Sequence, residues 1–325
     1  MLPDSKNASP KCLYLDTNKW IDLSRARYGQ PEGRAFQASL SAIIAARDEG
    51  KVLVPYSMVT TLELESRGDS ESRKRAIRFL VELSENRALL PFQYIVSAEI
   101  QNAMRAYFGK STSRSLRPNV VAHGVFSAFG RSVSIKSKSR AVEAQALLKA
   151  YSAETSLSLM LDAGAKRKLF YDSAVSDAEI VKIYERARSL NLSPEQRYGY
   201  ELIGFLSGGD TGKAFVDSMQ ELGLNQIEFA DRVRTTDDYQ QFVKLCPALW
   251  TFLELLLARD KNPGRPVKKN DFHDLLALSV AIPYCNIVVT EKDFADMIRR
   301  RKLDSEFGTT VLTKAELIEI ELMRL

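Results

Sequence analysis

Cysteine is scarce in this sequence, and long apolar runs are missing from it. The sequence has three cysteines, Cys12, Cys246 and Cys285, which are odd in number and show no CxxC spacing. This pattern supports neither a disulfide framework nor a thiolate zinc site, and it fits a reducing compartment. The most apolar stretch, 246–258, is too short to cross a bilayer and contains Glu254, and the polar residues 1–11 include no signal-peptide core. We therefore expect a cytoplasmic protein with no membrane partner.

Acidic residues are absent between Ile100 and Val142, where eight basic residues fall. The net charge of +5 is too small to establish a nucleic-acid partner by itself. A segment of one charge sign attracts a polyanion, although a solvated basic surface facing acidic helices is an equal alternative. We predict a basic loop at 109–140, with nucleic-acid contacts at Arg114, Arg117, Arg131, Lys136, Lys138 and Arg140.

Apolar patterning divides the 325 residues into an α/β part and a helical part. Short apolar runs predict strands at 13–15, 52–54, 286–290 and 309–313, with helices between them. The order β-α-β at the start implies a parallel pair with a right-handed crossover. The residues between Val96 and Ala258 show helical spacing without a strand. We therefore expect a discontinuous α/β domain at 1–95 and 258–325 and an all-α insertion at 96–257.

Carboxylates occur where the predicted strands stop. Asp16 directly follows the first strand, and Glu63 lies in the helix that Ser57 can cap after the second. Glu65 is about 200° further around that helix, so only one of the two glutamates can face Asp16. Each acid alone is most simply a helix cap or a solvated side chain. Together they mark one edge of a parallel sheet, where ligands bind in open α/β folds.

A second group of acids follows in NDFHDLLALSVA and VVTEKDF. Asp271 and Asp274 are three residues apart, on one face of a predicted first helical turn. Thr290 ends the next strand, and Glu291 and Asp293 follow it. His273, beside Asp274, is more commonly a packing residue than a metal ligand.

These motifs together resemble a PIN-domain nuclease. The resemblance rests on the strand ending in Asp16-Thr17-Asn18, the Ser57-to-Glu63 helix start, the HDLLALSVA helix and the VVTEKDF strand end, and it covers about 11–95 and 268–325. It implies a three-layer α/β fold with a parallel central sheet, interrupted by the helical insertion. It also implies an acidic cluster that holds Mg²⁺ or Mn²⁺, carried here by Asp16, Glu63, Asp274 and Asp293.

The resemblance leaves part of the acidic set open. Asp271 and Glu291 are further candidate ligands, and Asp296 is a rival to Asp293. Thr17, Asn18 and Thr290 are candidates for hydrogen bonding to the metal-binding acids.

The expected chemistry is hydrolysis of a phosphodiester by metal-activated water. Hard divalent cations prefer oxygen ligands, and they relieve the repulsion of clustered carboxylates. The resemblance implies an endoribonuclease that acts on RNA rather than DNA. It leaves open a role in a toxin–antitoxin or defence system, a protein inhibitor and the formation of homo-oligomers. A silent PIN-like module that binds RNA or protein is one alternative. An Asp-dependent phosphatase is another, weakened because Asn18 stands where its second acid belongs.

Overall fold

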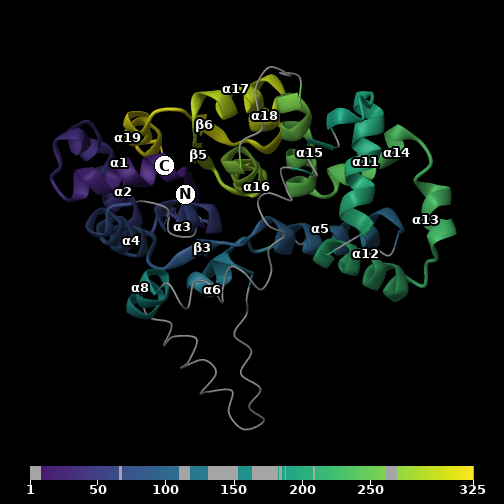
Figure 1. Ribbon diagram of the computed structural model, residues 1–325, viewed down its shortest axis with the longest axis horizontal. Coiled ribbons are helices and arrows are strands. Elements are labelled where there is room, and N and C mark those ends of the chain that lie inside the picture. The colour runs from purple at the N-terminus through teal and green to yellow at the C-terminus, as the bar shows by residue number, and fades with distance from the viewer. Residues whose placement is uncertain are drawn as a thin grey trace, which may run out of the picture. The chain divides into compact units, whose positions relative to one another are not determined.

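The chain forms two compact units, which are described separately below (Figure 1). The computed structural model describes residues 9–65, 68–109, 118–130, 153–162, 182, 185–186, 188–207, 209–260 and 269–324. Unit 1 comprises Met1–Leu89, Val121–Phe170 and Tyr284–Leu325, and unit 2 comprises Leu90–Val120 and Tyr171–Pro283.

Unit 1 contains a four-stranded parallel sheet. Its strands are β1 (Lys11–Leu15), β2 (Val52–Leu53), β5 (Ile287–Val289) and β6 (Thr310–Leu312), in the order β2-β1-β5-β6. Leu13 pairs with Ile287, so the two ends of the chain meet at the centre of the sheet. The predicted mixed α/β class and the parallel sheet are therefore confirmed.

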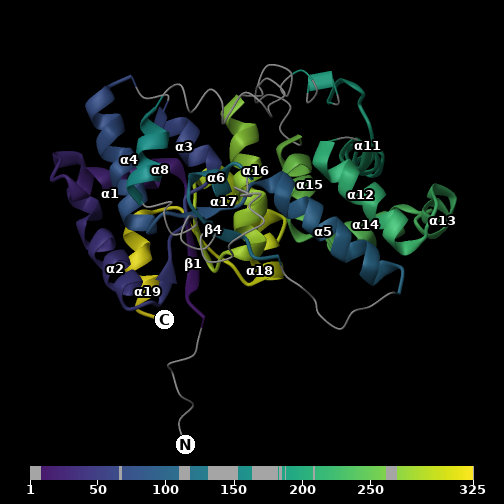
Figure 2. The same ribbon diagram turned by 90° about the horizontal axis from the view of Figure 1, so that it is seen from below.

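Helices follow and connect the strands of unit 1. They are α1 (Thr17–Arg27), α2 (Gln37–Asp48) after the 3-10 turn η2 (Pro31–Phe36), α3 (Met58–Glu65), α4 (Ser70–Ser84), α8 (Ala153–Leu161), α17 (Lys292–Arg300), α18 (Leu303–Phe307), η3 (Ala315–Leu317) and α19 (Ile318–Leu322). In Figure 2, α1, α2 and α4 lie side by side. Leu13, Leu15, Trp20 and Leu23 form part of one buried cluster, to which each such side chain contributes about 1.5–3 kcal/mol.

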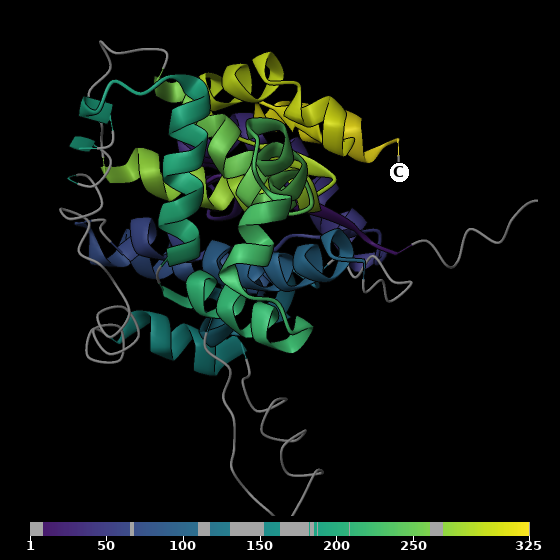
Figure 3. The ribbon, with the colours of Figure 1, turned by 90° about the vertical axis from the view of Figure 1, so that its right-hand side faces the viewer.

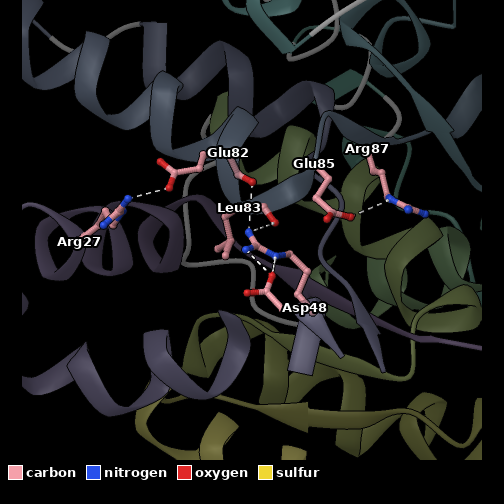
Figure 4. Close-up of polar contacts among 7 residues, drawn as sticks. Arg27, Asp48, Glu82, Leu83, Glu85 and Arg87 are labelled. Atoms are coloured by element: carbon pink, nitrogen blue, oxygen red, sulfur yellow. Dashed lines mark hydrogen bonds and ion pairs between the residues drawn. The ribbon is translucent and has the colours of Figure 1, made fainter. Parts of the chain in front are cut away.

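Polar contacts hold α2 against the end of α4 (Figure 4). The Arg47 guanidinium of α2 donates to the carbonyl oxygens of Glu82 and Leu83, at 3.2 and 3.5 Å. These carbonyls lie in the last turn of α4, where few helical N–H groups remain to pair with them, and the Glu82 carbonyl also accepts from the backbone N–H of Glu85 at 3.3 Å. Asp48 holds the same guanidinium at 2.6 Å. Arg27 of α1 reaches the Glu82 carboxylate at 2.8 Å, and Glu85 pairs with Arg87 at 3.6 Å.

A second small sheet corrects the predicted all-α insertion. β3 (Arg87–Leu89) pairs antiparallel with β4 (Val121–His123), and the short helix α6 (Val125–Ala128) follows. Both β4 and α6 fall within the stretch predicted as helical insertion and basic loop. The apolar residues Val120 and Val125 are buried there, although the surrounding Ser, Lys and Arg composition indicates a loop.

Every helix or strand described in unit 2 is a helix (Figure 3). Its helices are α5 (Phe92–Tyr107), α11 (Pro194–Ser207), α12 (Gly209–Leu222), α13 (Gln226–Arg232), α14 (Thr236–Lys244), α15 (Pro247–Asp260) and α16 (Lys269–Tyr284), whose last residue belongs to unit 1. Aromatic contacts join α5 to α15 through Phe92 and Phe252, whose ring centroids are 5.2 Å apart. The buried Glu99 of α5 accepts from the backbone N–H groups of Ala248 and Leu249, at 2.8 and 3.4 Å. Glu99 thus caps α15 from a neighbouring helix.

Candidate active site

The candidate site lies in unit 1, where the parallel strands end. β1 ends immediately before Asp16, and β5 ends immediately before Thr290. Ser57, after β2, accepts from the backbone N–H of Thr60 at 3.1 Å and so caps α3. Because neighbouring parallel strands end at the same edge of a sheet, the residues after β1, β2 and β5 share one edge.

Asp16 is the buried centre of this edge, with 7% of its surface exposed. One carboxylate oxygen, Oδ1, accepts from the Thr17 N–H at 2.7 Å and caps α1. The other, Oδ2, faces the Thr290 hydroxyl, which donates to it at 3.4 Å. The Asp16 N–H donates to the carbonyl of Val289 at 2.9 Å, which ties the end of β1 to the end of β5.

Two further acids act on Asp16 electrostatically. Burial raises the pKa of Asp16 to about 6, and the negative charges of Glu63 and Glu291 contribute to the rise. The hydrogen bonds from Thr17 and Thr290 oppose it. The structure therefore places Glu63 and Glu291 each close enough to Asp16 to disfavour its charged form.

Glu291 is held at this edge by a residue from the other end of the chain. The Asn18 side-chain amide donates to Glu291 Oε1 at 2.6 Å. Glu291 occupies the N-cap position of α17, and Asp293 is exposed in the first turn of that helix. The sequence favoured Asp293 as the acid that completes the cluster, whereas Glu291 is the one whose charge raises the Asp16 pKa.

The predicted acids of α16 belong to unit 2. Asp274 is half-buried there. Asp271 is 5% exposed and forms an ion pair with Arg259, which is 3% exposed. The sequence did not indicate Arg259 as a partner, because this arginine lies just before a basic linker and resembles a solvated residue. Arg114, Arg117, Arg131, Lys136, Lys138 and Arg140 lie outside the described residues.

The donors at the sheet edge fit a hard divalent cation in their chemistry. Asp16, Glu63 and Glu291 supply carboxylate oxygens, and a cation would relieve the repulsion that raises the Asp16 pKa. Across the described ranges, no group of three or more acidic, histidine or cysteine side chains already has the spacing of a metal site. Binding of one ion by all three carboxylates would therefore require them to move closer together.

Comparisons with known proteins add no family to this description. Neither protein-family models, nor curated proteins, nor solved structures match the chain. Among the described helices, none combines the length and the apolar character needed to cross a membrane.

Proposed function

We propose that this protein is a PIN-like, metal-dependent nuclease that hydrolyses phosphodiester bonds, with RNA as its substrate. One observation carries the proposal: a buried carboxylate at the end of the central strand, Asp16, has two further acids near it. Burial together with like charge is costly for a carboxylate, and proteins place such groups at functional sites.

The residues have distinct roles in this proposal. Asp16, Glu63 and Glu291 would hold Mg²⁺ or Mn²⁺, and such an ion, when bound, lowers the pKa of a water molecule and polarises a phosphate. Thr17 and Thr290 fix the direction of the Asp16 carboxylate through their hydrogen bonds.

Asn18 fixes the direction of the Glu291 carboxylate, since its amide donates to one carboxylate oxygen and leaves the other available. Asp274 and Asp293 enter the proposal through the sequence resemblance alone. RNA is likewise chosen from the resemblance, because the chain has no base-reading motif.

Cleavage of a fluorogenic single-stranded RNA, with matched DNA as a second substrate, tests the proposal. The wild type should cleave RNA with Mg²⁺ or Mn²⁺ and lose this activity in a chelator. Asp16→Asn, Glu63→Gln and Glu291→Gln should each lower the rate by more than about 100-fold, since even residues that only orient metal ligands contribute about 10–100-fold. Glu65→Gln, on the same helix as Glu63, is the matched control and should keep the wild-type rate.

Each contrary result has a definite meaning. Wild-type protein that cleaves neither RNA nor DNA with any divalent metal refutes the nuclease. RNA binding without cleavage supports the silent binding module instead. Hydrolysis of a phosphate monoester through a phosphoryl group bound covalently to Asp16, with RNA left intact, supports an Asp-dependent phosphatase.

A further inference from the structure

Two of the three cysteines meet in the centre of unit 1. Cys12 lies in β1 and Cys285 just before β5, and their Sγ atoms are 3.1 Å apart although the residues are 273 positions apart in sequence. Backbone contacts fix this approach, because the Asn286 N–H donates to the Cys12 carbonyl at 2.8 Å and the Asn286 side chain accepts from the Cys12 N–H at 2.9 Å.

The backbone placement also suits a covalent link. Cys12 lies opposite Asn286 in the register that continues from the Leu13–Ile287 pair, and Cys285 is the residue directly before Asn286. A strand spacing of about 4.8 Å combined with an offset of one residue, about 3.3 Å along the chain, gives a Cα separation of about 5.8 Å, which falls within the range of about 4.4–6.8 Å that disulfides span.

We propose that Cys12 and Cys285 are an oxidation site that closes to a disulfide in the presence of a hydroperoxide. The bond would join the first strand of unit 1 to its C-terminal segment, around the whole intervening chain. It would also hold together the two strands that end at Asp16 and Thr290, the edge of the sheet that carries the candidate site.

The reaction balances with hydrogen peroxide as the oxidant. Cys12 is the more exposed residue of the two, at 7% against 3%. Its sulfur attacks one peroxide oxygen and becomes a sulfenic acid, and one water leaves. The Cys285 sulfur then attacks the Cys12 sulfur, and the hydroxyl leaves as a second water with the Cys285 proton. Both sulfurs are oxidised, and the peroxide is reduced to two waters.

The electrostatic environment sets the rate. The hydrogen bond from Cys12 and burial raise the pKa of Cys285, so this sulfur is a thiol at neutral pH. Since the thiolate is the nucleophile, closure should be slow at neutral pH and accelerate as the pH rises. A small oxidant is needed because both thiols are buried.

Cys246 provides the matched control. It is also fully buried, and burial together with the Glu99 carboxylate raises the pKa of its thiol. It lies in unit 2 and has neither of the other two cysteines in its unit. It should therefore stay a thiol under conditions that oxidise the pair.

The test uses the full-length chain, reduced and then treated with hydrogen peroxide in a metal-free buffer. Remaining thiols are alkylated in denaturant, and the peptides are analysed by mass spectrometry. Wild type and Cys246→Ser should both yield one cross-linked peptide pair containing Cys12 and Cys285. Its mass should be two hydrogen atoms less than the sum of the two separate peptides. The oxidised wild type should also unfold at least about 5 °C higher than the reduced protein, because the bond closes a very long loop.

Cys12→Ser and Cys285→Ser should abolish both effects. If these variants fail to fold, the wild-type peptides still decide the question. The proposal is overturned if both thiols remain open to alkylation, if each oxidises separately to a sulfinic acid, or if the link involves Cys246 or a second chain. None of these results depends on RNA cleavage, so this experiment tests the cysteine pair separately from the nuclease proposal.

Discussion

Replacing Asp16 with asparagine should stabilise unit 1 at alkaline pH while abolishing its proposed function. The Asp16 pKa rises from its ordinary value of 3.8 to about 6 in the folded chain, which corresponds to about 3 kcal/mol. A carboxyl group with a raised pKa contributes stability below its unfolded pKa and loses that contribution as the pH rises through the folded value. At about pH 8 the ionised side chain therefore destabilises unit 1 by up to about 3 kcal/mol relative to a neutral one.

Asparagine suits this comparison because it is neutral and caps a helix as well as aspartate does. Asp16→Asn should gain up to about 3 kcal/mol at about pH 8, and the gain should vanish near pH 4, where the wild-type side chain is itself neutral. Asp69, the exposed cap of α4, supplies the control, because Asp69→Asn changes a cap without changing a buried charge.

Urea unfolding followed by tryptophan fluorescence measures the effect. The two tryptophans lie in different units, Trp20 in unit 1 and Trp250 in unit 2, so a Trp250→Phe background reports unit 1 alone. The titration is run in a chelator and then with Mg²⁺. At a Mg²⁺ concentration about 100 times its Kd, the ion should stabilise the wild type by about 2.7 kcal/mol and should not stabilise Asp16→Asn. An asparagine variant no more stable than wild type at alkaline pH, or a gain that persists in acid, refutes the reasoning.

Three further predictions concern single contacts. Glu99→Gln should destabilise unit 2 by about 1.5–3 kcal/mol, measured by urea unfolding, because it replaces a charged acceptor of two backbone N–H groups with a neutral one. The double variant Lys292→Gln, Lys314→Gln should weaken RNA binding, since both exposed lysines follow strands at the site edge. The slope of the logarithm of the binding constant against the logarithm of the salt concentration should become less steep by about 1.4. Lys51→Gln, before β2, should leave that slope unchanged when binding is titrated by anisotropy. Asn18→Ala should slow cleavage by about 10–100-fold while unit 1 unfolds at the same urea concentration, and an unchanged rate would contradict its role.

The sequence predicted the central sheet because its signals are local. Each strand of that sheet is a short run of apolar residues that stops abruptly, and the predicted ends agree with β1, β2, β5 and β6 to within two residues. Ser57 illustrates the same point, since its capping bond to Thr60 spans only three positions. By contrast, β4 is three residues long and depends on pairing with β3 more than thirty positions away. No pattern within residues 121–123 indicates that partner.

The choice among the acids after Thr290 shows the same limit. Glu291 and Asp293 both follow the strand, and spacing alone does not separate them. The difference comes from Asn18, which contacts Glu291 across 273 positions, and from the position of Glu291 near Asp16. Such a contact exists only after the two ends of the chain have formed one sheet.

Asp16 and Asp271 are both buried acids, and their partners distinguish what each can do. Arg259 forms an ion pair with Asp271 within unit 2, so a cation already compensates the burial of that carboxylate. For Asp16 the charges that shift its pKa within the described chain are those of two acids, and none is a cation. A buried carboxylate whose charged neighbours are also carboxylates is stabilised when a cation binds between them. This difference makes Asp16, rather than Asp271, the acid around which a metal site can form.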